Sequence, residues 1–94
     1  MAVLVTTEFD ATAAQYDAVD KVLDARNNPP DGFIAHTAED RGGKMGIVDV
    51  WESQEAFGAF AESRLGPALA EALGDDAPEP PQPEFTELHN AYKG

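Results

Sequence analysis

The chain has 94 residues, enough for one domain, and carries 18 Asp and Glu against 6 Lys and Arg, a net charge of -12. Hydrophobic residues make up 43% of it, which predicts a packed core and argues against disorder. Such an acidic protein with scattered basic residues is not expected to bind nucleic acid or an anionic membrane. The absence of cysteine excludes thiolate nucleophiles and thiolate metal sites.

The N-terminal residues show neither the basic region nor the apolar stretch of a signal peptide. No apolar run approaches the roughly 20 residues that a membrane helix needs. We therefore expect a cytoplasmic protein with no membrane partner.

The first half of the chain predicts a strand, a helix and a loop. Residues 2–7 are rich in β-branched side chains, as in a strand. Thr12 and Gln15 match a capping box, and apolar side chains at positions 16, 19, 22 and 23 share one face of the helix that follows. The run 27–32, with two Asn, two Pro and a Gly, ends this helix.

The second half predicts two strands, a helix and a last strand. The strands are Phe33–Ala38 and Lys44–Trp51, joined by a hairpin turn at 39–43. Ser53 caps a helix with a stripe of Ala and Phe, which Gly66 and Pro67 break or bend. An acidic, Pro-rich linker at 74–83 leads to a strand at 84–92.

This order predicts an α+β fold, the ferredoxin-like βαββαβ unit, as a single domain over residues 1–94. Its four-stranded antiparallel sheet carries both helices on one face, which leaves the other face bare. The strand at 44–51 is apolar at nearly every position, so both of its faces are expected to be buried. A second copy of the sheet is the natural cover, which predicts a homodimer.

The segment Gly46–Phe57, with its Trp-Glu-Ser…Phe motif, resembles the strand-to-helix signature of dimeric α/β-barrel proteins. It is most similar to the small antibiotic biosynthesis monooxygenase-like group, and segments 32–37 and 64–69 are similar to its short actinobacterial members. The resemblance implies a homodimer whose two sheets form a barrel, with a small-molecule pocket between sheet and helices in each subunit. Members of this family include cofactor-free oxygenases of aromatic phenols, heme-degrading enzymes, isomerases, polyketide cyclases and proteins without known activity.

His36 and Asp49 are the candidate catalytic residues. With an even hairpin loop, Asp40–Gly43, Glu39 faces Lys44 as a cross-strand ion pair, and His36 shares a face with Asp49, one diagonal step away. A loop one residue longer separates them. Asp49 lies between two valines, so it either orients His36 as a general base or meets a polar rim or a backbone amide. The alternative for His36 is a structural role, as a core or surface residue whose hydrogen bonds are satisfied.

Other candidates define a binding surface for a planar ligand. The resemblance implies that Trp51 stacks on a substrate, and core packing with Phe57 and Phe60 is the alternative. One of Thr6 and Thr7 faces inward, and we name Thr7. Tyr92 either reaches the pocket or anchors the C-terminus. In barrel families the last strand contributes to the dimer interface, which places Leu88 and His89 there.

No cofactor or metal is expected. Two His and Asp49 lack the spacing of a metal site, and no glycine-rich phosphate loop occurs. Heme degradation is disfavoured, because the Asn and helical His of heme-degrading relatives are missing. We expect a cofactor-free monooxygenase-like enzyme that acts on a planar aromatic, polyketide-like molecule by proton abstraction through His36. The alternatives are an isomerase or cyclase on the same fold, a non-catalytic binding module, and an acidic interaction surface.

Overall fold

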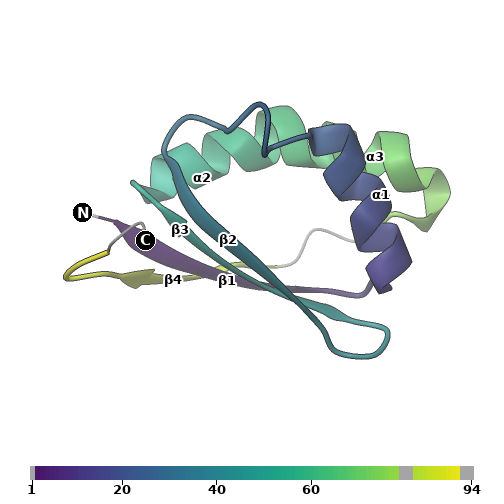
Figure 1. The fold of residues 1–94 in the computed structure, drawn as a ribbon, viewed down its shortest axis with the longest axis horizontal. Coiled ribbons are helices and arrows are strands. Elements are labelled where there is room, and N and C mark those ends of the chain that lie inside the picture. The colour runs from purple at the N-terminus through teal and green to yellow at the C-terminus, as the bar shows by residue number, and fades with distance from the viewer. Residues whose placement is uncertain (1, 79–81, 92–94) are drawn as a thin grey trace.

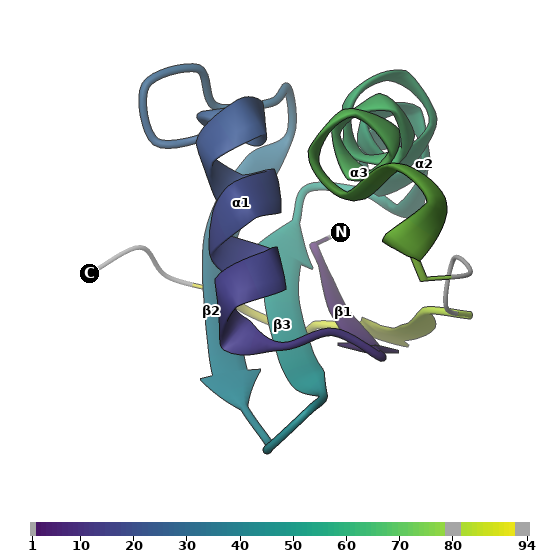
Figure 2. The same ribbon diagram turned by 90° about the vertical axis from the view of Figure 1, so that its right-hand side faces the viewer.

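A computed structural model describes residues 2–78 and 82–91 and shows one antiparallel sheet with helices on a single face (Figures 1 and 2). The strands β1 (Val3–Phe9), β2 (Phe33–Asp40), β3 (Met45–Trp51) and β4 (Glu84–Glu87) lie in the order β2-β3-β1-β4. The helices are α1 (Ala13–Leu23), α2 (Gln54–Phe60) and α3 (Gly66–Leu73). The arrangement confirms the predicted ferredoxin-like βαββαβ order.

Both predicted helix starts are confirmed at the level of their caps. The Thr12 hydroxyl accepts from the Gln15 amide at 3.1 Å, and the Gln15 side chain accepts from the Thr12 amide at 2.8 Å, which completes the capping box. Ser53 accepts from the Ala56 amide at 3.1 Å at the start of α2. These side chains satisfy amides that have no partner inside the helix.

The predicted break at Gly66 and Pro67 is a change of helical pitch. One π-helical segment, η1 (Ala61–Leu65), joins α2 to α3, and the Gly66 amide donates to the Ala61 carbonyl five residues back. Proline has no amide hydrogen, and its ring crowds the preceding turn of an α-helix, so a wider turn there lets the chain continue. A 3₁₀ turn, η2 (Gly74–Asp76), then ends the helical segment.

The limits of β1 and β4 differ from the sequence-based ones. β1 extends to Phe9, two residues beyond the predicted end, and β4 ends at Glu87 instead of residue 92. The Leu88 amide still donates to the Ala2 carbonyl at 2.9 Å. Tyr92 lies outside the described residues.

The β2–β3 hairpin has an even loop, as predicted, but its register is shifted by two residues. Glu39 faces Gly46 rather than Lys44, so the predicted Glu39–Lys44 pair is wrong. The reason is the turn: Gly42 and Gly43 have φ of 68° and 88°, the positive values that the two central residues of the shortest hairpin turn require. The Arg41 amide therefore bonds the Lys44 carbonyl at 2.8 Å, and the turn chemistry prevails over a surface ion pair.

The basic residues of this turn pair across strands instead. Lys44 lies 2.8 Å from the Asp10 carboxylate, and Arg41 contacts Glu8 at 2.9 Å as well as Glu39. Gly46 lies beneath the Arg41 guanidinium, where a Cβ would come within 2.5 Å of that group. Gly46 thus admits a charge bridge across three strands on the face away from the helices.

The core lies between the sheet and α2. Trp51 and Val5 are each 1% exposed and pack with Phe57, with further aromatic rings around them. The opposite sheet face carries Leu4, Val48 and Val50, which are partly exposed. That face has no helix over it in the described chain (Figure 2), and its cover by a second copy stays a prediction. No helix among the described residues has the length and apolarity to cross a membrane.

Candidate functional site

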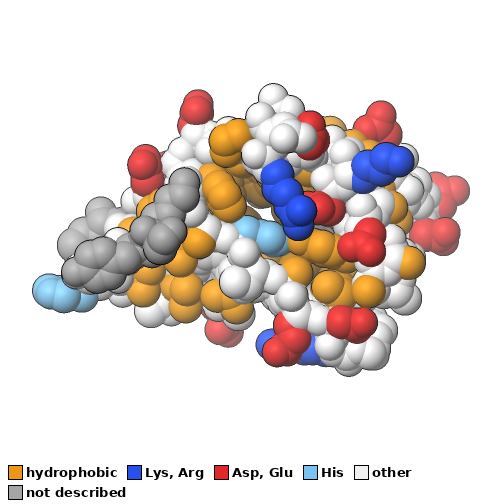
Figure 3. Space-filling model, viewed as in Figure 1, with side chains coloured by type: hydrophobic (Ala, Val, Ile, Leu, Met, Phe, Trp, Pro, Cys, Tyr) orange, Lys and Arg blue, Asp and Glu red, His pale blue; other side chains and the backbone are white. Residues whose placement is uncertain are grey.

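A cavity of about 490 Å³ lies between the sheet and the helices, within the size range of small-molecule sites, about 300 to 1,000 Å³. Figure 3 shows a hollow on this side, bordered by hydrophobic side chains with a few charged ones. The sheet forms one wall, α1 the facing wall, and α2 with its aromatic residues closes one end. The lining includes Thr7, Tyr16, Asp20, Phe33, His36, Ile47, Asp49, Trp51, Phe57 and Phe60.

A bulge in β2 brings two residues of odd spacing into this cavity. Phe33 faces Trp51, and Ala35 faces Val50, so the pairing shifts at Ile34. In a regular strand, residues three apart point to opposite faces. The extra residue returns His36 to the face that Phe33 occupies, directly opposite Asp49.

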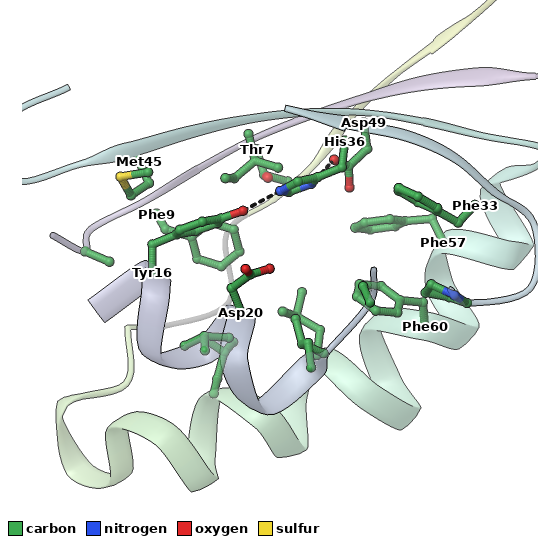
Figure 4. A pocket seen from close by; sticks show the side chains of 18 of the residues that line it. Thr7, Phe9, Tyr16, Asp20, Phe33, His36, Met45, Asp49, Phe57 and Phe60 are labelled. Carbon is green, nitrogen blue, oxygen red and sulfur yellow. Dashed lines mark hydrogen bonds and ion pairs between the residues drawn. The ribbon is translucent and has the colours of Figure 1, made fainter. Parts of the chain in front are cut away.

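Four side chains form one hydrogen-bonded chain, Tyr16–His36–Asp49–Trp51, which joins α1 to the sheet. Figure 4 shows its first three members, with Tyr16 directed at His36. The Asp49 carboxylate accepts from His36 Nδ1 at 2.6 Å and from Trp51 Nε1 at 3.2 Å. The Tyr16 hydroxyl lies 2.5 Å from His36 Nε2. Asp49, which is 7% exposed, thus bonds two side chains rather than a backbone amide.

Only one tautomer of neutral His36 fits this hydrogen-bonded chain. With the hydrogen on Nδ1, it donates to the carboxylate, and Nε2 accepts from the Tyr16 hydroxyl. The hydrogen bond to Asp49 raises the pKa of His36 above its ordinary value, against the opposing effect of burial. Burial, with the Asp20 and Asp49 charges, raises the pKa of Tyr16 to about 12. The site therefore holds a phenol next to an imidazole whose affinity for a proton is raised.

Two polar residues of the cavity were not identified in the sequence. The sequence-based prediction places Tyr16 only on the buried face of the helix and does not include Asp20. The residues are one turn apart, so they share a helix face with the buried Val19 nearby. A phenol and a carboxylate within an otherwise apolar stripe are the signal that would have revealed them.

The structure places the other described candidates in two groups. Thr7, Trp51, Phe57 and Phe60 line the cavity, and Trp51 also packs in the core, with its ring 5.1 Å from Phe60 between centroids. His89, which is exposed, and Leu88 follow β4 and do not line the cavity. No group of three or more potential metal ligands converges among the described residues.

The loop after α1 borders the cavity, and Arg64 holds it in place. Its guanidinium donates to the Leu23 carbonyl at 2.9 Å and to the Asn28 carbonyl at 2.8 Å. Asp24, in the left-handed conformation with φ of 48°, ends α1 and accepts from the side chain of Asn27. These contacts hold Arg26, whose side chain lines the cavity, at its rim.

The arrangement can accept a proton inside an apolar cavity. Asp49 stabilises the imidazolium that forms when His36 takes a proton, and the aromatic residues offer flat surfaces for a planar ligand. The wall on the α1 side adds a hydroxyl and a carboxylate as polar contacts.

Comparison with known proteins supports the fold. No known family model matches the sequence, and no curated protein shows significant similarity to it. A proposed antibiotic biosynthesis monooxygenase from Chloroflexus aurantiacus superposes with a TM-score of 0.67, at 18% identity over 100% of both chains. SnoaB, a cofactor-independent oxygenase from Streptomyces nogalater, gives 0.64 at 17% identity over 96% of this chain and 95% of that one. Rv0793 from Mycobacterium tuberculosis gives 0.64 at 18% identity, over 97% and 98%.

At these identities the likeness concerns the fold, and the activities belong to the proteins that carry them. The order of strands and helices and the near-complete coverage of both chains agree with the resemblance seen in the sequence. The chain therefore has the ferredoxin-like fold of the antibiotic biosynthesis monooxygenase-like proteins.

Proposed function

We propose that this chain is a cofactor-independent enzyme of the antibiotic biosynthesis monooxygenase-like type, acting on a planar, aromatic, polyketide-like molecule. The observation that carries the proposal is the chain Tyr16–His36–Asp49–Trp51 in the wall of the apolar cavity. A buried carboxylate with an imidazole partner is a means of tuning a general base toward neutral pH.

Proton abstraction runs through His36. The substrate, an acidic phenol or carbon acid, gives its proton to the Tyr16 oxygen while the Tyr16 proton moves to His36 Nε2. Because the pKa of Tyr16 is about 12, this residue is a phenol before and after the transfer. The Asp49 carboxylate holds the imidazolium by the bond to Nδ1. Tyr16 then donates a hydrogen bond to the substrate anion.

Oxygen reacts with the substrate anion itself. The anion transfers electrons to dioxygen, a carbon–oxygen bond forms, and the resulting peroxide takes up the proton. Loss of water from the hydroperoxide leaves a carbonyl, so a CH₂ group and one O₂ become C=O and one H₂O. The substrate supplies all the electrons, and the aromatic walls keep bulk water from the anion.

The test is oxygen consumption with anthrone as the probe substrate. We expect the wild-type chain to accelerate uptake and His36→Gln to lower the rate about 100- to 10,000-fold. Asp17→Asn is the control, because Asp17 is exposed and does not line the cavity. An unchanged rate in His36→Gln refutes the assignment. Conversion without oxygen uptake identifies an isomerase or cyclase, and binding alone identifies a carrier module.

The proposed active form is a homodimer in which two sheets face each other as a barrel. The partly exposed Leu4, Val48 and Val50 on the uncovered face support this, and we assign Leu88 and His89 to its edge. Light scattering at micromolar concentration is expected to give twice the 10.0 kDa chain mass. The mass of a single chain contradicts the dimer.

A further inference from the structure

Asp20 is a carboxylate that the mechanism above does not use. It lies one helical turn after Tyr16 on α1, is partly buried, and lines the cavity. Figure 4 shows its carboxylate directed into the cavity, on the side where Tyr16 and His36 meet. No hydrogen bond or ion pair engages this side chain within the described chain, whereas Asp49 has two side-chain donors.

Arg26, the basic residue at the rim of the cavity, does not neutralise the Asp20 carboxylate. Arg26 lines the same cavity, but no ion pair joins it to Asp20 among the described residues. Both residues act on His36, where the charge of Asp20 raises the pKa and that of Arg26 lowers it. Because Asp20 is only partly buried, water can reach its carboxylate before a ligand binds.

A planar ligand that fills the cavity displaces this water. A carboxylate that loses water without gaining a donor raises the free energy of the complex. The neighbouring cavity walls do not replace the lost water as a hydrogen-bond donor, because they consist largely of apolar rings and aliphatic side chains. Binding is therefore favourable only for a ligand that brings its own donor to this position.

We propose that Asp20 selects aromatic ligands that carry a second hydrogen-bond donor, a hydroxyl or amino group next to the ionising hydroxyl. This inference rests on the proposed function for the placement of the first hydroxyl at Tyr16. Residues four apart on a helix are neighbours, so the two donors lie on one edge of the ring system. The substrate class is an ortho- or peri-disubstituted phenol.

The test compares a naphthalene diol with adjacent hydroxyl groups and its monomethyl ether, which lacks the second donor. Calorimetry under nitrogen measures both dissociation constants without oxidation of the diol. The wild-type chain is expected to prefer the diol by about 10- to 100-fold, the range of a hydrogen bond to a charged group. Asp20→Ala is expected to abolish the preference, and Asp20→Asn, which keeps the shape without the charge, to reduce it.

Asp17→Ala is the matched control, because Asp17 is an exposed acid of the same helix and does not line the cavity. It is expected to keep the full preference. The inference is overturned if Asp20→Ala or Asp20→Asn retains the wild-type ratio, if the wild-type chain does not distinguish the probes, or if it binds neither.

Oxygen uptake separates this result from the proposed function. A diol preference that depends on Asp20 without any oxygen uptake supports the ligand selection and refutes the oxygenase. Uptake that depends on His36 with equal affinity for both probes supports the oxygenase and refutes the selection.

Discussion

Replacement of Asp49 by Asn removes one charge from the centre of the site and leaves its shape. The carboxylate accepts two hydrogen bonds, at 2.6 Å from His36 and 3.2 Å from Trp51. An amide has one acceptor oxygen and one donor nitrogen, so it can serve only one of two donors. Alternatively His36 changes tautomer, which places a hydrogen on Nε2 and removes the lone pair that accepts from Tyr16.

The expected loss of stability follows from one hydrogen bond to a charged group, about 1.5 to 3 kcal/mol. For a domain of this size, a loss of ~2 kcal/mol lowers the melting temperature by about 8 to 16 °C. The opposing effect is the desolvation cost of the buried carboxylate, which the amide relieves. We expect the lost hydrogen bond to prevail, because the carboxylate has good partners on both oxygens.

The effect depends on pH with a definite sign. The folded-state pKa of His36 is raised above 6.5, so its stabilising contribution is fully present below that value and is lost as the pH rises through the folded pKa. The difference in the free energy of unfolding between wild type and Asp49→Asn should therefore be larger at about pH 6 than at about pH 8.5.

Urea unfolding measures this difference. Trp51, the single tryptophan and 1% exposed, reports on the core by fluorescence, and circular dichroism gives an independent signal. Asp17→Asn, at an exposed position, is the control and should differ little from wild type. Equal stability of wild type and Asp49→Asn at both pH values, or a difference that grows with pH, refutes the reasoning.

Three further predictions concern single contacts. Tyr16→Phe keeps the ring and removes the hydroxyl that bridges substrate and His36, so oxygen uptake should fall about 100-fold or more with little change in melting temperature; unchanged uptake contradicts the relay. Arg64→Met removes one hydrogen bond to the end of α1 and one to the loop after it, and should cost about 1 to 3 kcal/mol in urea unfolding. Equal stability means that other contacts hold this segment. Trp51→Phe should lower the free energy of unfolding by less than the ~3 to 5 kcal/mol expected for truncation to Ala. It should also change the pKa of His36, because Asp49 loses the hydrogen bond from Trp51. If NMR titration shows an unchanged pKa of His36, Trp51 does not act on His36 through Asp49.

Interactions between residues close in the sequence predicted the helices and strands well. The capping box of Thr12 and Gln15 and the Ser53 cap are contacts between residues three apart, so the sequence contains all that forms them. The anomaly of Asp49 within an apolar strand likewise pointed to the site. The prediction of an even hairpin loop correctly places His36 on the same sheet face as Asp49. Whether the number of loop residues is odd or even decides this face, even where the exact register differs.

The rest depends on tertiary geometry that spacing alone does not contain. The exact register follows from Gly42 and Gly43, whose preference for a two-residue turn prevails over a surface charge pair. No turn residue in the sequence marks the bulge at Ile34. The bulge is what brings Phe33 and His36 to the same face of the sheet. Tyr16 reaches His36 only because α1 crosses the sheet at that point, a packing angle that the residues of α1 do not define by themselves.

Titration of His36 by ¹⁵N NMR tests the central claim most directly, since the proposed chemistry needs a lone pair on Nε2 and a carboxylate on Nδ1. We predict a pKa above 6.5 and, in the neutral form, a hydrogen on Nδ1 with Nε2 accepting from Tyr16. Asp49→Asn should return the pKa toward its ordinary value. A wild-type pKa at or below 6.5, with the neutral ring protonated on Nε2, contradicts the account.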